Sequence, residues 1–330
     1  METHTIHREL LRRRVRILVV GCGGTGSAIA AGLPYLQHAL IASGHPGGIH
    51  VTLMDGDTIS PTNCVRQPFA RCELGLHKTV VLVNRLNVFW GVDWEAVPVS
   101  LGEHQRIEET DIVIGCVDTR AARAAIQAAT TNDSQVHYAI DLGNTMDSGQ
   151  FVLGEPLNEV NRRSRTRLRT VAELYPAIVD PQLDDDGQPS CSAMDSLLRQ
   201  EPFVNQILAQ HALALLARLF WYGTISYHGG FVSLVSGTCA PLRIEPKTWK
   251  RIQGRQRLEA ARRHLCRLLS VLLGAARLPD RQVMKLAASP SSIVGGLARL
   301  GEGAEKTRSY RHAAQRRSLG PSGESPRAVQ

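Results

Sequence analysis

A run of glycines between an apolar segment and a helical one constrains the fold most strongly. Residues 15–20, VRILVV, are apolar and rich in β-branched side chains, as in a strand buried on both faces. Residues 21–26, GCGGTG, come next, and an Ala/Leu/Ile pattern with helical spacing follows. Gly21, Gly23 and Gly26 form G-x-G-x-x-G, a tight turn that lets backbone approach an anion at a helix N-terminus. The sequence therefore predicts a strand–turn–helix unit that binds a nucleotide phosphate.

Strand-like and helix-like segments alternate along the first 145 residues. Further strands are predicted over 49–55, 111–118 and 136–145, and helices over 75–88 and 119–130. This alternation is typical of a doubly wound α/β domain, with a mainly parallel, Rossmann-like sheet and helices on both faces. We expect residues 1–150 to form the nucleotide-binding core.

The second half of the sequence is less regular. We expect residues 151–305 to complete the fold with a cysteine-bearing crossover loop, strands over 151–156 and 229–237, and helices over 194–222 and 255–276. Residues 306–330 hold six basic residues and one acidic residue and few large apolar ones, which predicts a disordered tail. This tail supplies +5 of the net charge of +8, so the charge does not indicate a DNA-binding domain. Nucleic-acid contact is expected, if at all, only through the tail.

The cysteines and the apolar segments predict a cytoplasmic protein. None of the seven cysteines forms a C-x-x-C pair, so the sequence offers no zinc-ribbon spacing and zinc is not expected. The odd count suits a reducing compartment, and the N-terminus lacks the apolar segment of a signal peptide. The longest apolar stretch, residues 211–223, contains Arg218 and is too short to span a bilayer.

The glycine motif alone does not identify the nucleotide. In NAD-dependent enzymes an acidic residue about 20 positions after the glycines binds the ribose. Here Asp55 lies 34 residues after Gly21, and the inserted loop SGHPGG at 43–48 accounts for the excess. On these residues an NAD(P)-dependent oxidoreductase stays open, as does a glycine turn without any ligand.

The residues after Asp55 favour ATP. Arg66 can bind phosphate oxygens with its forked guanidinium, and Lys78 can act as a point charge. Asp118 ends the strand predicted over 111–118, where it can coordinate Mg²⁺. Cleavage of ATP between its α- and β-phosphates needs positive charges and Mg²⁺ to compensate the charge that develops on the phosphates. Hydride transfer does not require Arg66, Lys78 or Asp118. Singly, each has another reading: a solvated surface charge for Arg66 or Lys78, and a helix N-cap for Asp118.

Taken in order, these motifs resemble the ThiF/MoeB/HesA family of ubiquitin-activating-enzyme-like adenylyltransferases. The family pattern combines G-x-G-G-x-G, D-x-D-x-V-x-x-S-N-L-x-R-Q, G-x-x-K and a strand that ends in Asp with an Arg nearby. The matching segments are GCGGTG, LMDGDTISPTNCVRQPF, LGLHK and IVIGCVDTRAAR. Cys64 stands where the family has Leu. The resemblance covers residues 15–145 well and the rest loosely.

The resemblance implies an activity, a set of site residues and partners. In the family, the C-terminal carboxylate of a small ubiquitin-like or sulfur-carrier protein attacks the α-phosphate of ATP, and pyrophosphate leaves. Asp118 would bind Mg²⁺, Asp55 the ribose, and Gln67 and Asp57 would support the site. The phosphates would meet the glycine loop and three side chains, namely Gly21, Gly23, Gly24, Gly26, Asn63, Arg66 and Lys78.

The resemblance also implies a homodimer, because MoeB-type members supply an N-terminal arginine to the neighbouring subunit. Only fourteen residues precede the first predicted strand, and the candidates there are Arg8, Arg12, Arg13 and Arg14. Since none of them is strongly placed, a non-catalytic scaffold with the ThiF fold is kept as an alternative.

A second step through a cysteine thioester is the last expectation. The segment QPSCSAMDS, residues 188–196, resembles the P-x-C-T motif around the thioester cysteine of ubiquitin-type activators, with Ser192 in place of Thr. A helix that starts just after Cys191 could lower the pKa of its thiol. Cys191 is therefore either the nucleophile or a bystander thiol. The arrangement and the inserted loop are most similar to the ThiF-like members of PRTRC cassettes.

Overall fold

The computed structural model describes residues 2–102, 107, 109–132, 135–164, 166–184 and 201–272. Two compact units divide the chain, Met1–Gln256 and Arg257–Gln330. All the strands described below lie in the first unit. The predicted tail, residues 306–330, lies outside the described residues, and the predicted boundaries at 150 and 305 stay predictions.

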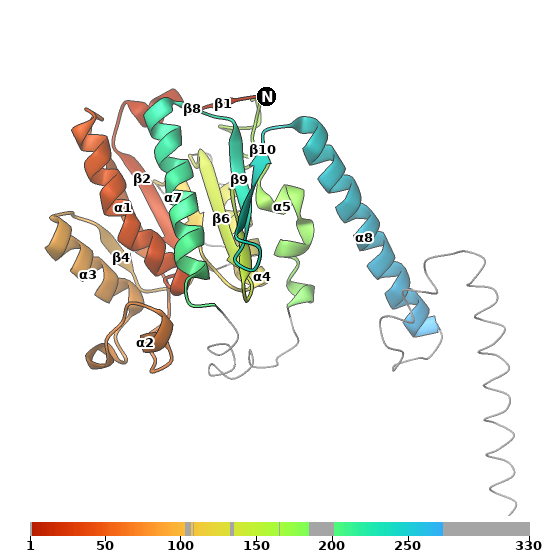
Figure 1. The fold of residues 1–330 in the computed structure, drawn as a ribbon, viewed down its shortest axis with the longest axis horizontal. Helices are drawn as coiled ribbons and strands as arrows, with labels where there is room; N and C mark the ends of the chain where they lie inside the picture. Colours follow the sequence, from red (N-terminus) through yellow and green to blue (C-terminus); the bar gives the residue numbers. More distant parts are fainter. Residues whose placement is uncertain are drawn as a thin grey trace, which may run out of the picture. The chain divides into compact units, whose positions relative to one another are not determined.

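An eight-stranded sheet in the order β10-β9-β7-β6-β5-β2-β3-β4 forms the centre of the first unit (Figure 1). The strands from β4 to β6 run parallel, and β7, β9 and β10 extend the sheet with antiparallel pairing. The predicted doubly wound, mainly parallel sheet is therefore confirmed. The strands are β2 (Val15–Val20), β3 (Ile49–Met54), β4 (Glu95–Val97), β5 (Ile112–Gly115), β6 (Tyr138–Asn144), β7 (Ser148–Gly154), β9 (Tyr227–Ser233) and β10 (Thr238–Arg243).

Helices cover both faces of this sheet because its central strands are apolar on both sides. In β2, Ile17 and Val19 face the larger core, while Leu18 and Val20 face a smaller core on the opposite side. Helices α1, α3 and α7 cover one face, and α4 and α5 the other (Figure 1). The helices are α1 (Gly24–Ala42), α2 (Asn63–Arg66), α3 (Lys78–Trp90), α4 (Arg120–Asn132), α5 (Val171–Leu174), α7 (Val204–Tyr222) and α8 (Pro246–Leu272).

The second half of the chain differs in detail from its prediction. The strand expected over 229–237 is the first arm of a hairpin, because β9 ends at Ser233 and Gly237 turns the chain with a φ of +62° into β10. A further two-stranded sheet pairs β1 (His4–Thr5) with β8 (Thr224–Ile225). Both features depend on pairing between segments whose local pattern is weak.

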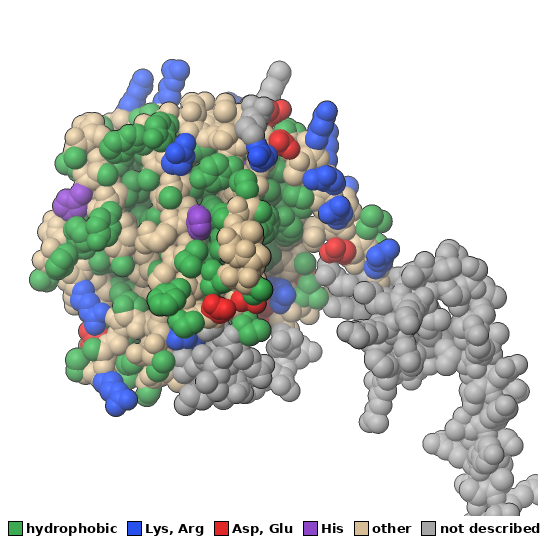
Figure 2. Space-filling view, in the orientation of Figure 1, with side chains coloured by type: hydrophobic (Ala, Val, Ile, Leu, Met, Phe, Trp, Pro, Cys, Tyr) green, Lys and Arg blue, Asp and Glu red, His purple; other side chains and the backbone are tan. Residues whose placement is uncertain are grey.

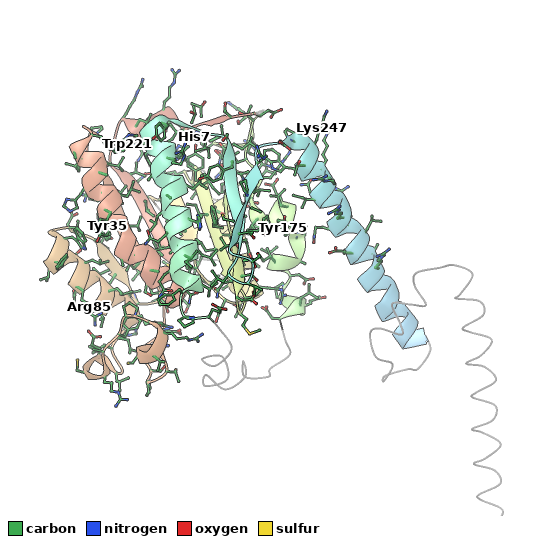
Figure 3. The ribbon with its side chains drawn as sticks, in the orientation of Figure 1. His7, Tyr35, Arg85, Tyr175, Trp221 and Lys247 are labelled. Atoms are coloured by element: carbon green, nitrogen blue, oxygen red, sulfur yellow. The ribbon has the colours of Figure 1, made fainter. Side chains whose placement is uncertain are left out.

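Helix α1 makes two close approaches that glycines permit. A Cβ atom on Gly26 would lie 1.8 Å from the carbonyl oxygen of Gly21, and one on Gly32 would lie 2.3 Å from Cδ1 of Leu213 in α7. The outer sides of α1 and α7 carry exposed aromatic rings, among them Tyr35 and Trp221 (Figure 3). Hydrophobic side chains accordingly gather over these helices in Figure 2. Of the helices in the described part of the chain, none has the length and apolar character needed to cross a membrane.

Replacement of Gly26 tests the close crossing of α1 over the glycine turn. Gly26→Ala should lower the free energy of unfolding by about 3 kcal/mol, because its Cβ would overlap backbone that has nowhere to move. The measurement is urea denaturation followed by circular dichroism. Gly254→Ala in α8 is the control, since its Cβ meets no described atom, and it should be neutral or slightly stabilising. Equal stability of the two variants would contradict this packing.

The burial of His228 allows a prediction of how the free energy of unfolding depends on pH. Its Nδ1 donates to the carbonyl of Leu153 at 2.7 Å, and its Nε2 accepts from the indole N–H of Trp249 at 3.0 Å. Burial lowers the pKa of His228 from 6.5 to about 4, so the unfolded chain takes up a proton in this interval and the folded chain does not. The free energy of unfolding should therefore fall by about 3 kcal/mol as the pH drops from 7 to 4.

Denaturant titrations at several pH values measure this loss. His228→Gln removes the titrating group, so its stability should depend less on pH than that of the wild type, even if the variant is less stable overall. His38→Gln, on the exposed side of α1, should keep the wild-type dependence. The same pH dependence in His228→Gln and in the wild type would exclude His228 as the source.

Candidate active site

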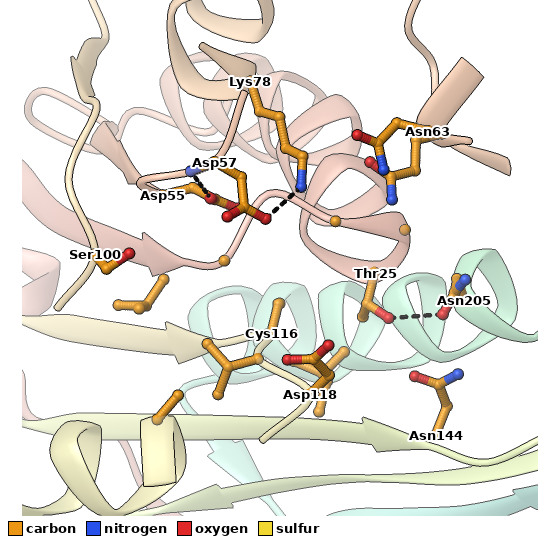
Figure 4. A pocket seen from close by; sticks show the side chains of 18 of the residues that line it. Thr25, Asp55, Asp57, Asn63, Lys78, Ser100, Cys116, Asp118, Asn144 and Asn205 are labelled. Atoms are coloured by element: carbon orange, nitrogen blue, oxygen red, sulfur yellow. Dashed lines mark hydrogen bonds and ion pairs between the residues drawn. The ribbon is translucent and has the colours of Figure 1, made fainter. Parts of the chain in front are cut away.

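The carboxyl ends of the parallel strands meet at a cavity of about 850 Å³. It lies where β2 has β3 on one side and β5 on the other, the topological switch point at which open α/β sheets bind ligands. The structure brings ten of the predicted site residues to this cavity (Figure 4). They are Gly21, Gly23, Gly24, Asp55, Asp57, Asn63, Arg66, Gln67, Lys78 and Asp118. Of the other two, Gly26 packs behind the turn, and Cys191 lies outside the described residues.

Asp55 fastens the glycine turn to the loop after β3. Its Oδ2 accepts a hydrogen bond from the backbone N–H of Cys22 at 2.5 Å, and its Oδ1 accepts from the N–H of Asp57 at 2.8 Å. Each carboxylate oxygen has a second lone pair, so Asp55 can still accept a hydroxyl hydrogen bond from a ligand. The same side chain is thus able to shape the turn and to hold a ribose.

Lys78 brings a positive charge to the first turn of α3. The residue is only 5% exposed, and its Nζ donates to Oδ2 of Asp57 at 2.7 Å. The Asp57 side chain is 70% exposed, so solvent screens this ion pair and makes it weak. The N-terminus of α3 already carries a partial positive charge. Lys78 and the N-terminus of α3 therefore place a full and a partial positive charge side by side. A phosphate could take the place of Asp57 as the negative partner of both.

Helix α2 and the residue after it present amide groups to the cavity. Oδ1 of Asn63 accepts hydrogen bonds from the backbone N–H and the hydroxyl of Ser60, at 2.8 and 3.0 Å. The amide hydrogens of Asn63 are therefore the part of this side chain left for a ligand. The buried Oε1 of Gln67 has no hydrogen-bond partner in the described part of the chain, and a bound ligand could satisfy it.

Asp118 lies beyond the end of β5 and faces Asp55 and Asp57 across the cavity (Figure 4). The described residues contain no group of three or more His, Cys, Asp or Glu side chains placed to hold a metal ion. Mg²⁺ does not need such a group, because it is commonly bound by one or two carboxylates, by water and by the phosphates of its substrate. One exposed carboxylate beside a phosphate site fits this mode of binding.

Sequence reasoning missed several residues of the cavity, among them Arg123, Asn144 and Asn205. Arg123 lies within the quoted IVIGCVDTRAAR segment but received no role. Its Nε donates to Oδ1 of Asp141 at 3.0 Å, and one Nη donates to the carbonyl of Leu142 at 3.3 Å. Burial raises the pKa of Asp141, while the guanidinium of Arg123 acts in the opposite direction. Arg123 lies in α4 and Asp141 in β6, and the two meet only when the helix packs on the sheet. The local sequence pattern therefore could not predict this contact.

Cys116, which lines the cavity, and Cys22, in the glycine turn, are poor nucleophiles. Burial raises the pKa of the Cys22 thiol and of the Cys116 thiol, which keeps both protonated at neutral pH. Cys64 is half-buried on α2, and Cys72 and Cys239 are exposed. The expectation for Cys191 is untouched by these observations and stays a prediction.

Two of the four candidate N-terminal arginines form ion pairs with carboxylates that do not line the cavity. Arg13 donates both Nη groups to the buried carboxylate of Asp111, at 2.7 and 2.6 Å. Arg14 pairs with Asp93. Arg8 and Arg12 are exposed. The homodimer and the source of an arginine for a neighbouring site therefore stay predictions.

The fold and the cavity define an α/β protein with a glycine turn at the edge of the sheet where ligands commonly bind. Comparison with protein families narrows this class: the model of the ThiF family matches residues 7–152. The resemblance to that family is thus confirmed for this part of the chain. The inserted loop and the PRTRC subfamily are not tested by this match.

Comparison with solved structures finds partial matches of low sequence identity. PaaA is 15% identical, with a TM-score of 0.47, over 70% of this chain and 64% of its own. E. coli MccB with ATP is 16% identical, with a TM-score of 0.46, over 70% of this chain and 64% of MccB. MccB with AMPCPP and MccA is 16% identical, with a TM-score of 0.48. This match covers 70% of this chain and 65% of the MccB chain. This chain thus spans just under two thirds of these proteins. No curated protein matches its sequence.

Proposed function

We propose that the protein is a Mg-ATP-dependent adenylyltransferase that activates the C-terminal carboxylate of a small ubiquitin-like or sulfur-carrier protein. The observation that supports this most is the convergence of Asp55, Arg66, Lys78 and Asp118 on one cavity beside the glycine turn. The match of residues 7–152 to the ThiF family supports the same class of reaction.

In the proposed reaction an oxygen of the carrier carboxylate attacks the α-phosphorus of ATP. The bond from that phosphorus to the bridging oxygen breaks, and pyrophosphate leaves with the electron pair. The attacking group is already ionised, so no general base is needed. Negative charge builds up on the leaving pyrophosphate, and Lys78, Arg66 and the amide hydrogens of Asn63 are the groups that stabilise it. Asp118 would hold Mg²⁺, which supplies further charge compensation to the phosphates when bound.

Two other functions explain less of the cavity. An NAD(P)-dependent oxidoreductase would use the glycine turn and Asp55, but it leaves Arg66, Lys78 and Asp118 without a role. A scaffold that only binds a partner has no need for a complete set of charged side chains around a cavity. We therefore keep both as alternatives that experiment can distinguish.

We further propose a second step in which the thiolate of Cys191 attacks the carbonyl carbon of the acyl adenylate. The bond to the phosphate oxygen then breaks, AMP leaves, and a thioester forms. A homodimer in the cytoplasm and the PRTRC-type subfamily complete the proposal. These points depend on sequence resemblance around Cys191 and on the inserted loop.

Two substitutions test the adenylation chemistry. Lys78→Met keeps the buried stem of the side chain but removes its charge, and Asp118→Asn removes the carboxylate charge. Each should reduce pyrophosphate–ATP exchange by about 100-fold or more, because a preorganised charge-stabilising group is lost. The assay uses the full chain with a small carrier protein that ends in Gly. Lys247→Met on α8, away from the cavity, is the control and should keep full exchange activity.

The same assay separates the three functions. Tight ATP binding by the wild type without any exchange would favour the scaffold. Binding of NADH without binding of ATP would contradict the adenylyltransferase and favour the oxidoreductase.

Cys191→Ser tests the second step alone. This variant should retain pyrophosphate exchange and lose a thioester that reducing agents cleave, as seen on non-reducing gels after incubation with ATP and carrier. Cys72→Ser, at an exposed cysteine, should still form the thioester. Thioester formation by Cys191→Ser would show that another cysteine is the nucleophile.

A further inference from the structure

Asn205 connects the second half of the chain to the glycine turn. It is the second residue of α7, only 7% exposed, and it lines the cavity beside Gly23 and Gly24. Its Oδ1 accepts a hydrogen bond from the hydroxyl of Thr25 at 2.8 Å (Figure 4). This contact joins residues 180 positions apart in the sequence.

The hydrogen bond from Thr25 orients the amide group. Because Oδ1 accepts from the hydroxyl of Thr25, the other polar atom of the planar amide, Nδ2, is the donor that remains. A Cβ atom on Gly24 would lie 2.4 Å from this Nδ2. The amide nitrogen therefore lies directly against the turn, and the absence of a side chain at Gly24 provides the space for it.

Within the described parts of the chain, no hydrogen-bond acceptor is paired with the Nδ2 of Asn205. This amide donor is therefore available to an acceptor that enters the cavity, which Asn205 lines. The cavity is the side from which one can come. The oxygens of a phosphate are the acceptors expected next to a glycine turn at a helix N-terminus.

We propose that Asn205 is a nucleotide-binding residue whose side-chain amide donates a hydrogen bond to a phosphate oxygen of the bound nucleotide. This inference rests on the nucleotide binding in the proposed function. It assigns a phosphate contact to a residue outside the segment that matches the ThiF family. Helix α7 holds the donor in place, since it packs along α1 and Leu213 fits against Gly32.

Asn205→Asp removes the donor. The aspartate keeps nearly the same shape and still accepts from Thr25, but it replaces the amide hydrogens with a negative charge. Isothermal titration of the full chain should show ATP affinity at least about 10-fold weaker than in the wild type, with adenosine affinity unchanged. Gln206→Glu, the same amide-to-carboxylate change at the exposed neighbouring position, is the control and should leave both affinities unchanged.

Two outcomes of this titration would contradict the inference. Unchanged ATP affinity in Asn205→Asp would show that the amide does not contact a phosphate. An equal loss of ATP and adenosine affinity would show that Asn205 acts only through the shape of the site. A selective loss of ATP affinity, in a protein that performs no pyrophosphate exchange, would support the phosphate contact and contradict only the proposed reaction.

Discussion

The close contact between Gly26 and the carbonyl oxygen of Gly21 is the constraint on which the rest of the site depends. With no room for a side chain at position 26, α1 starts directly over the end of β2. That position brings the N–H of Cys22 to Asp55 and so fixes the loop that follows β3. It also places Gly32 against Leu213, which sets the distance between α1 and α7. This crossing therefore positions the glycine turn, the loop after β3 and helix α7 relative to one another.

The charges around the cavity favour a bound anion even though three aspartates line it. Helices α1, α3 and α7 all begin at or near the cavity, so the positive ends of their dipoles point towards it. Asp55 is already occupied by two backbone N–H groups, and Asp57 serves as an exposed counter-ion of Lys78. Asp118 lies on the far side of the cavity, and it is the carboxylate proposed to hold Mg²⁺. An anionic phosphate between these groups would therefore be stabilised, whereas a neutral ligand would gain little from the same arrangement.

Local pattern was sufficient to predict the parallel core and most of the cavity, because the relevant residues follow strands directly. Asp55 and Asp118 come just after β3 and β5, so the fold class alone places them at one edge of the sheet. Contacts that depend on tertiary structure were not predictable in this way. Asn205 meets Thr25 only because α7 packs on α1, and Arg123 meets Asp141 only because α4 covers β6. The β9–β10 hairpin was missed for a related reason, since its second strand is exposed and lacks an apolar run.

Helix α7 owes its precision to contacts at both ends. At its C-terminal end, β8 pairs with β1, and the N–H of Ile6 donates to the carbonyl of Gly223 at 2.9 Å. At its N-terminal end, Asn205 is fixed by Thr25, one residue after the start of α1. A helix secured in this way cannot shift along α1 without breaking both sets of contacts. The amide of Asn205 is therefore held in place by the fold alone, and a nucleotide bound as proposed would not have to offset the conformational entropy of ordering this helix.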